Sequence, residues 1–529
     1  MENVKLSKET LKLMPNEALV EIILLLQNNI EQLNHNIELL TEQLKINNQR
    51  KYGRSSETAS SMFEQQHFDL AFNEAEASVD ESVEEVTVKQ LPKKKQKGTK
   101  ENNLKKITNH REVLIEMSDE ELNEKYGEGK WKKLPMETIV KLEHHPAYFE
   151  VVTYKIGVYA KNDNETIVRA ERPQELLPGS IITPSLMSSI LFAKYVNAVP
   201  LYRQEQAYQN NDVFISRQNM ANWTIKMSEM YFKSYYEEMK KELVKEDILN
   251  VDETPFLVTK DGRDAGSKSY MWVYRSSHNK KMVLYDYQLT RNAQHPQNYL
   301  KDYTGVIVSD GYAAYHKMEK EHPEQFKVAG CWSHLKRIFS TVIKSVGEEK
   351  AKGTVAEMAS VKISKLYHMD NKGKDMTIEE RSNYRQEIIK PIVDEFFEWA
   401  KVNYPKVPKN SETGKGLQYA INQEKYLRLF LTNPMIPLDN NAAERSIRPF
   451  CLGKKNWVMI DTIRGAEASS IIYSIVETAK ANDLKIYDYL NYLLEELPKH
   501  TTTFNTELPS RLFPWSDEFP QELRKATDK

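Results

Sequence analysis

Three acidic residues that lie far apart in the chain form a candidate metal-binding triad. Asp252 lies inside the apolar run NVDETPFLV, Asp310 follows the apolar run GVIVS, and Glu444 begins the segment ERSIRPF, which has helical spacing. An unpaired carboxylate in an apolar strand is unfavourable, and a bound cation would remove that penalty. Mg²⁺ prefers oxygen ligands, and two such ions can activate a water or a 3′-hydroxyl and stabilise a leaving oxygen.

Basic side chains follow Glu444 closely. Arg445 and Arg448 lie at helical spacing, and Lys454 and Lys455 come just downstream. Arginine can hold a phosphate by charge and by paired hydrogen bonds. These four residues are therefore candidates to bind a DNA backbone, and the alternative is a surface helix with solvated charges.

The helix that would carry Glu444 has a predicted start and a predicted end. Asp439, Asn440 and Asn441 belong to the residue types that cap the first turn of a helix. Pro449 is expected to end the helix, because proline cannot donate the next backbone hydrogen bond. The cap would fix the direction in which Glu444 points.

The elements that must position the two aspartates follow from the apolar runs. Strands are expected at 248–258, 269–275 and 281–288, then a helix at 296–303 and a buried strand at 305–310. This is the order of a ribonuclease-H-like domain. Strand ends at one edge of an open sheet would bring Asp252 and Asp310 together. Residues 328–342 read as a strand that becomes a helix, and a helical insertion at about 345–432 accounts for the distance in sequence to Glu444.

A helix-turn-helix pattern precedes these strands. Helices are expected from Thr183 to about 195, from Pro200 to about 210, and from Ser216 onward. Arg217, Gln218 and Asn219 begin the third helix, the position from which such motifs contact base edges in the major groove. The alternative is a plain helical bundle with polar ends.

A heptad repeat occupies residues 15–48. Its apolar positions are Leu19, Ile23, Leu26, Ile30, Leu33, Ile37, Leu40 and Leu44. Isoleucine at one seam position and leucine at the other favour a parallel two-stranded coiled coil, and therefore a homodimer or a higher oligomer. The alternative is an amphipathic helix packed on its own domain.

Composition supplies the remaining boundaries and excludes some classes of protein. We expect a charged linker at 55–106, a small α+β module at 107–176 with paired strands within 147–160, a helical DNA-binding region at 178–244, a catalytic domain at 245–497 and a C-terminal tail at 498–529. The fold class is thus multidomain α+β. A net charge of −2 argues against a uniformly basic nucleic-acid binder. Two cysteines exclude a disulfide framework, and no secretion signal or membrane span is recognisable, which predicts a cytoplasmic protein with no membrane role.

Five motifs together resemble the transposases of the insertion-sequence-sixty-six family. They are VDETP at 251–255, SDGYAAY at 309–315, GCWSHLKRIF at 330–339, NNAAERSIRPFCLGKKNW at 440–457 and GAEASSIIYSIVETAKANDLKIYDYL at 465–490. The resemblance implies a DDE-type transposase with a ribonuclease-H-like catalytic domain. Asp252, Asp310 and Glu444 match the family's acidic triad residue by residue.

The same resemblance implies the partners and the cofactor. The partners would be double-stranded DNA, both element ends and target, in a bacterial cell where the bound protein lies on the nucleoid. The cofactor would be Mg²⁺ or Mn²⁺, as two ions. One step would free a 3′-hydroxyl by hydrolysis, and the next would join it to target DNA. The coiled coil would pair subunits so that two ends meet, with accessory proteins of the same element left open.

Cys331 and His334 match a Cys-x2-His element that follows the second aspartate in several DDE families. Structural zinc needs four ligands, and no second pair is evident, so we expect a structural brace near the site, with Trp332 packed at the same corner. Lys336 and Arg337 could contact phosphate. Relatives often carry a cysteine-rich module before the helical region, but residues 107–174 contain no cysteine, so zinc is not expected.

Two other functions stay open at this point. A metal-dependent, structure-specific nuclease on the same fold would cleave without joining. A catalytically disabled DNA-binding dimer could act as a repressor, although the intact triad argues against it. If Glu444 lay far from the aspartates, Glu253 and Glu477 would be the substitutes.

Overall fold

The computed structural model describes residues 174–264, 266–276, 278–500 and 508–526, with short pieces nearer the N-terminus. The chain divides into two compact units, one of residues 1–54 with 175–525 and the other of 55–174 with 526–529. In the second unit, β1 (Val158–Ala160) pairs antiparallel with β2 (Ile167–Arg169). Residues 149–153, also within the predicted strand segment, are not a strand.

The predicted coiled coil lies mostly outside the described residues. Leu19 and Ile23 are described and helical, and the Ile23 side chain is exposed. Pairing through this segment therefore stays a prediction.

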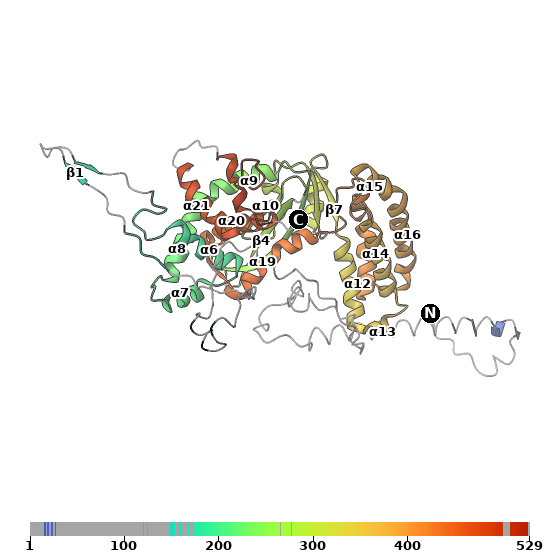
Figure 1. Cartoon of the computed structure of the whole chain (residues 1–529). Coiled ribbons are helices and arrows are strands. Elements are labelled where there is room, and N and C mark those ends of the chain that lie inside the picture. Colours follow the sequence, from blue (N-terminus) through green and yellow to red (C-terminus); the bar gives the residue numbers. More distant parts are fainter. Residues whose placement is uncertain are drawn as a thin grey trace. The chain divides into compact units, whose positions relative to one another are not determined.

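A mixed sheet organises the first unit (Figure 1). Within the described residues its strands are β3 (Ile248–Lys260), β4 (Lys268–Ser276), β5 (Met282–Gln288), β6 (Gly305–Ser309), β7 (Phe326–Gly330) and β8 (Ile460–Thr462). Their order is β5–β4–β3–β6–β7, and β8 pairs with the far end of β3. The β3–β4–β5 pairs are antiparallel, whereas β6, β7 and β8 join in parallel. Every strand predicted between residues 248 and 330 is confirmed.

The helices before the sheet also follow the prediction. They are α6 (Pro184–Leu191) with its π-helical continuation η1 (Phe192–Val196), α7 (Leu201–Gln209), α8 (Arg217–Met227), the π-helical η2 (Ser228–Phe232) and α9 (Lys233–Leu243). The hydroxyls of Thr183 and Ser216 cap α6 and α8 by accepting from Leu186 N and Asn219 N. Both caps are of the type that stabilises a helix start.

Helices connect the later strands and form the predicted insertion. They are α10 (Gln294–Tyr299), α11 (Ala313–Glu321), α12 (Trp332–Val346), α13 (Glu348–Ala351), α14 (Val355–Asn371), α15 (Ile378–Tyr384), η3 (Arg385–Ile389), α16 (Lys390–Asn403), η4 (Tyr404–Lys406), α17 (Glu412–Asn422), α18 (Glu424–Leu427) and η5 (Leu429–Leu431). Figure 1 shows α12, α14, α15 and α16 side by side as a bundle. The helical pattern expected at 345–432 is confirmed, while the helix expected at 296–303 ends earlier, at Tyr299.

The last part of the unit contains α19 (Asn441–Trp457), α20 (Ile463–Ala481), α21 (Ile486–His500), η6 (Ser510–Leu512) and η7 (Gln521–Leu523). The prediction that Pro449 ends its helix is wrong, because α19 continues through it to Trp457. An interior proline costs about 3 kcal/mol. Burial of Ile447 and Phe450 on either side of it offsets this, at roughly 1.5–3 kcal/mol for each side chain.

Two hydrophobic cores hold these elements together. One joins the sheet to α6–α9 and α19–α21, and the other fills the helical insertion and reaches β6 and β7. Ile307 belongs to the first core and Val308 to the second, because successive side chains of a strand point to opposite faces. Strand β6, which leads to Asp310, is thus buried on both faces.

Candidate active site

Asp252 lies on β3, and Asp310 directly follows β6, the neighbouring parallel strand. The register of β3 and β6 pairs Asn250 with Val308, and each aspartate stands two residues beyond that pair. The two residues therefore lie at the same level along the two strands, as the strand pattern predicts.

The turn after β6 holds Asp310. Its Oδ1 accepts from the N–H of Tyr312 at 3.1 Å, and its carbonyl accepts from the Tyr419 hydroxyl at 2.8 Å. Gly311 has φ +93°, a conformation that favours glycine, and a Cβ there would lie 2.7 Å from that hydroxyl. The Asp-Gly pair in the sequence is thus required by this turn.

Asn440 fixes the start of α19 on the sheet, which differs from the predicted cap. Its side chain does not cap the helix but donates to the Val251 carbonyl at 2.8 Å and accepts from Asn250 Nδ2 at 2.9 Å. Asp439 instead makes the hydrogen bond to the backbone at the helix start, since its Oδ1 accepts from Asn441 N at 3.0 Å. The carboxamide of Asn440 therefore ties α19 to the strand that carries Asp252.

Arg275 provides a second tie between α19 and the sheet. It lies on β4 opposite Asn250, and its Nη1 donates to the Ser446 hydroxyl at 2.8 Å. Asn250, Asp252 and Arg275 share one face of the sheet, because alternate residues of a strand and directly paired residues lie on the same side. Glu444, in the first turn of α19, is thereby held over the face that carries Asp252.

Glu444 is 8% exposed and is paired with an arginine. Arg337 Nη2, from α12, lies 2.6 Å from its Oε2. The predicted phosphate contact Arg337 is thus a partner of the predicted catalytic glutamate.

The charges of Asp310 and Glu444 both act on the ionisation of Asp252. Burial raises the pKa of Asp252 well above its ordinary value, and the charges of Glu253, Asp310 and Glu444 raise this pKa further. The N–H of Glu253 donates to the Asp252 carboxylate and opposes the effect. Asp252 is therefore the residue at which the negative charges of the site converge.

Glu253 and Glu477 have other partners. The side chain of Glu253 lies on the opposite face of β3 from Asp252. There Arg291 Nε donates to Glu253 at 2.7 Å, and the guanidinium of Arg291 stacks on the Tyr312 ring. Burial and the Asp310 charge raise the pKa of Glu253 to about 7, and Arg291 opposes them. Glu477, on α20, pairs with Lys480 at 2.7 Å.

The donor chemistry of the triad fits Mg²⁺. A hard divalent cation prefers oxygen ligands, and its charge offsets the mutual repulsion of carboxylates. Within the described residues, however, no group of three or more His, Cys, Asp or Glu side chains is arranged to hold a metal ion. The Glu444 carboxylate lies on Arg337, so the three carboxylates interact without forming a closed set of ligands.

Cys331 and Trp332 connect α12 to the segment before α19. Cys331 Sγ accepts from His334 N and from Asn440 N, so this thiol caps α12 and holds Asn440. Burial raises the pKa of the Cys331 thiol to about 12. Trp332 N and Nε1 donate to the carbonyls of Leu438 and Leu427. These contacts hold the start of α12 against the segment that leads into α19.

The predicted phosphate-binding residues differ in exposure. Arg445, Arg448 and Lys455 lie on the exposed face of α19. Lys454 instead turns toward the sheet, where its Nζ donates to the Pro255 carbonyl at 2.7 Å. Lys336 is half-buried on α12.

Arg217, Gln218 and Asn219 are all exposed at the start of α8. The guanidinium of Arg217 lies 5.4 Å from the centre of the Tyr202 ring, and the backbone N–H of Arg217 donates to Glu205 Oε1. Both partners belong to α7, so α7 and α8 are tied at the turn between them.

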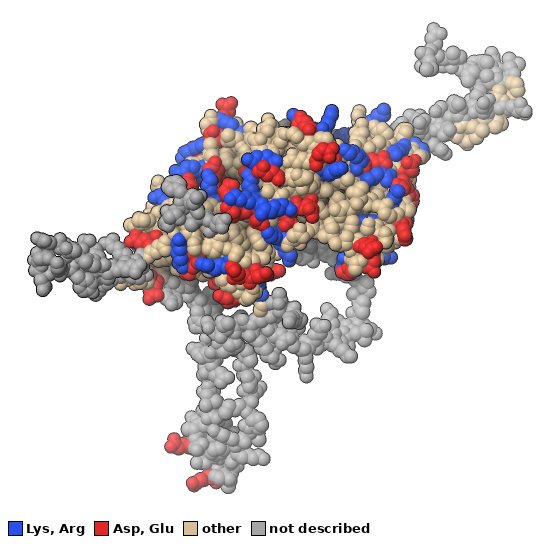
Figure 2. Space-filling model, turned by 90° about the horizontal axis from the view of Figure 1, so that it is seen from above, with Lys and Arg blue, Asp and Glu red and all other residues tan. Residues whose placement is uncertain are grey.

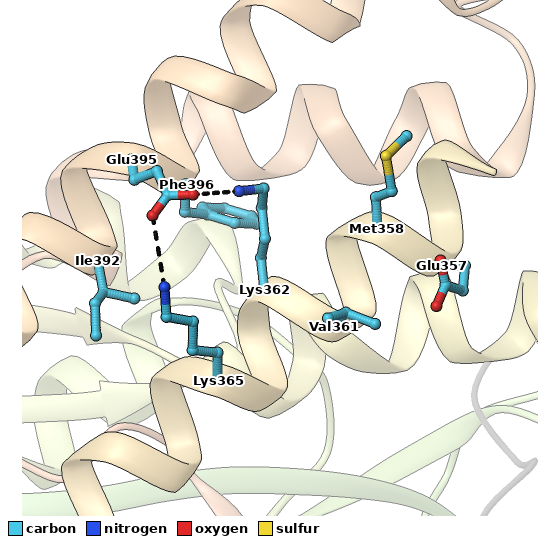
Figure 3. A pocket seen from close by; sticks show the side chains of 8 residues that line it. All are labelled: Glu357, Met358, Val361, Lys362, Lys365, Ile392, Glu395 and Phe396. Atoms are coloured by element: carbon cyan, nitrogen blue, oxygen red, sulfur yellow. Dashed lines mark hydrogen bonds and ion pairs between the residues drawn. The ribbon is translucent and has the colours of Figure 1, made fainter. Parts of the chain in front are cut away.

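The surface outside this site is mixed in charge. Basic and acidic side chains are interspersed over the face in Figure 2. A hollow between α14 and α16 lies in the helical insertion and is lined by Glu357, Met358, Val361, Lys362, Lys365, Ile392, Glu395 and Phe396 (Figure 3). Lys362 and Lys365 both face Glu395 there, and no predicted site residue lines it.

Sequence reasoning missed Asn440 as a tie to the sheet, and it missed Arg275 and Tyr419 entirely. Asn440 stands in a run of residues that commonly cap helices, so the sequence suggested a cap and not a hydrogen bond to β3. Arg275 ends an apolar strand, which was a usable signal.

No helix in the described part of the chain is long and apolar enough to cross a membrane.

Comparisons with known proteins identify the family of this chain. Residues 179–468 match the family described as Transposase IS66 family, residues 474–515 match the IS66 C-terminal element, and residues 39–108 match a region described as Transposase C of IS166 homeodomain. The uncharacterised protein y4qI of Sinorhizobium fredii is 26% identical over 91% of this chain and 89% of its own length. A second uncharacterised protein of that organism, y4hP, is 25% identical over 74% of this chain and 72% of its own. The chain belongs to the IS66 family of transposases.

Proposed function

We propose that this chain is a DDE-type transposase that cleaves the ends of an insertion sequence and joins them to target DNA. Asp252, Asp310 and Glu444 would be its catalytic carboxylates. The strand order β5–β4–β3–β6–β7, with α19 on the sheet, supports a ribonuclease-H-like catalytic domain at about 245–497. Residues 15–48 would pair subunits, and 178–244 would bind DNA.

The observation that supports this proposal is the electrostatic interaction of the three carboxylates. They come from β3, from the turn after β6 and from α19, yet all of them influence the ionisation of Asp252. Structural ion pairs also perturb pKa values. Here, however, the charges of Asp310 and Glu444 act on Asp252, which lies on the face to which Asn440 and Arg275 hold α19, and this supports a site for a cation and a phosphodiester.

The chain's own residues would bind and orient the DNA. Asp252 and Asp310 would hold one Mg²⁺ or Mn²⁺ and Glu444 would complete the second site, where such ions lower the pKa of water and stabilise a leaving oxygen. Arg445, Arg448 and Lys455 would fix the scissile strand by its phosphates.

A donor plasmid that carries the coding sequence with its native flanking DNA tests the proposal. In cells that also carry a recipient plasmid, the parent chain should yield insertions, and Asp252→Ala should lower their number at least about a thousandfold. Retention of insertion by Asp252→Ala would refute the triad. With purified protein, Mg²⁺-dependent cleavage without joining would instead identify a nuclease, and binding without cleavage would identify a repressor.

A further inference from the structure

The end of α19 opposite Glu444 presents apolar side chains to solvent on a strained turn. Val458 has φ +64° and ψ −50°, and it is 58% exposed. The N–H of Met459, itself exposed, donates to the Trp457 carbonyl at 2.7 Å, which closes a γ-turn. A positive φ is rare for a β-branched residue, and such a turn is strained. Strain of this kind clusters at functional sites.

The turn is held from two sides. Asn456 Nδ2 donates to the Ala198 carbonyl at 2.9 Å, just before α7. Ile460 pairs with Val258, which fixes the chain to β3 directly after the turn. The tip formed by Val458 and Met459 therefore lies between the candidate DNA-binding helices and the catalytic sheet.

A stripe of exposed residues leads from the triad to this tip. Arg445, Arg448, Leu452 and Lys455 follow one another at intervals of three and four, so they share one face of α19. The exposed Met459 follows just beyond the end of this helix. This stripe has no carboxylate, and Asp461, the next acidic residue in sequence, is neutralised by Lys260 at 2.7 Å. Cations interleaved with apolar side chains match a DNA backbone with bases beside it.

We infer that Val458 and Met459 form an apolar wedge that contacts the bases of the bound duplex. At the helical rise, the wedge would lie about 20 Å from Glu444, or about six base pairs along DNA. Apolar side chains of this type enter a groove or part a base step. The inference rests on the proposed function, because it requires DNA along α19.

Duplex binding measured across a series of salt concentrations tests the wedge. The probe is a labelled fragment of the native DNA that flanks the coding sequence, and every protein carries Asp252→Ala so that the DNA stays intact. Val458→Gly removes the apolar side chain and tolerates positive φ, so its Tm should equal or exceed that of the parent. Its affinity, and that of Met459→Ser, should nevertheless fall roughly tenfold, with an unchanged dependence on salt.

Two further variants separate the possible failures. Lys455→Gln should reduce the slope of log K against log salt by about 0.9, as loss of one phosphate contact requires. Val361→Ser, at an exposed apolar position on α14, should change neither the affinity nor its dependence on salt.

If Lys455→Gln lowers the slope while both wedge variants bind normally, the wedge is wrong and the proposed function stands. If neither the Lys455 nor the wedge variants affect binding, DNA does not lie along α19. A changed oligomeric state with unchanged affinity would make the tip a protein interface and overturn the wedge.

Discussion

Glu444 illustrates why a residue of the candidate active site needs its neighbours to be understood. It is buried, its charge contributes to the raised pKa of Asp252, and its Oε2 is paired with Arg337. Arg337 itself is 42% exposed, so it can reach solvent or a phosphate without unfolding α12. The pair therefore stabilises a glutamate that would otherwise add negative charge to the site without compensation.

Replacement of Arg337 tests this pairing. Arg337→Gln should lower the free energy of unfolding by about 1 kcal/mol, because a mostly buried carboxylate loses its cation while the exposed arginine loses little. Urea denaturation measures this change. Lys336→Gln, one position away and without contact to Glu444, is the matched control and should have a smaller effect. The double variant Arg337→Gln/Glu444→Gln should recover most of the loss, and simple additivity would contradict the pairing.

The sequence allowed the three carboxylates to be proposed at the residue scale, because each one stands in an element with a recognisable pattern. The partners of these residues could not be predicted. Arg337 was proposed as a phosphate contact, and its pairing with Glu444 was not foreseen. Side-chain pairs between elements more than a hundred residues apart depend on packing that no local pattern encodes.

At the scale of elements, the thiol of Cys331 connects α12 to Asn440, the residue just before α19. Cys331 Sγ accepts from His334 N at 3.4 Å and from Asn440 N at 3.2 Å. The first bond caps α12, and the second holds the residue that ties α19 to β3. The spacing of Cys331 and His334 thus serves helix geometry, with the backbone of His334 as the donor.

Replacement of Cys331 separates this brace from a packing role. Cys331→Val should lower the free energy of unfolding by about 1 kcal/mol or more, because two buried N–H groups lose their acceptor. Cys331→Ser keeps an acceptor and should retain more stability and more insertion activity in the donor-plasmid assay. Equal loss in the two variants, measured by urea denaturation, would show that volume rather than hydrogen bonding matters there.

Pattern predicted these elements well and their ends less well. Strands β3 to β6 were recognisable from apolar runs, and Ser216 was recognisable as a cap. Pro449 was misjudged because proline is a local signal, whereas the burial of Phe450 and Ile447 that keeps α19 continuous is a tertiary effect. Asn440 was misjudged for the same reason.

At the scale of the whole first unit, the helical insertion contributes directly to the candidate site. Tyr419, on α17, donates to the carbonyl of Asp310, and Arg385 fixes the segment that leads into α19. Arg385 is fully buried and its Nη1 donates to the carbonyls of Phe430, Asn433 and Ile436. Its Nε lies 2.9 Å from Asp370 Oδ1. The insertion is therefore a support for both Asp310 and Glu444.

Arg385→Met should be strongly destabilising, by about 3–5 kcal/mol, since it leaves Asp370 buried without its main partner. Arg381→Gln removes a longer and more exposed contact to the same aspartate, 3.3 Å away, and should cost less than about 1 kcal/mol. Thermal unfolding of the two variants makes the comparison. A similar Tm for both would contradict the assigned role of Arg385.

The central claim is that Asp252, Asp310 and Glu444 act as one metal-dependent site, and calorimetric titration with Mn²⁺ tests it most directly. Asp252→Asn, Asp310→Asn and Glu444→Gln should each weaken Mn²⁺ binding about tenfold or more, and pairs of these substitutions should lose less than the sum of their single losses. Glu477→Gln, which removes a buried carboxylate outside the site, should bind as the parent does. Unaltered Mn²⁺ binding by any one of the three triad variants, or an equal loss in Glu477→Gln, would contradict the account.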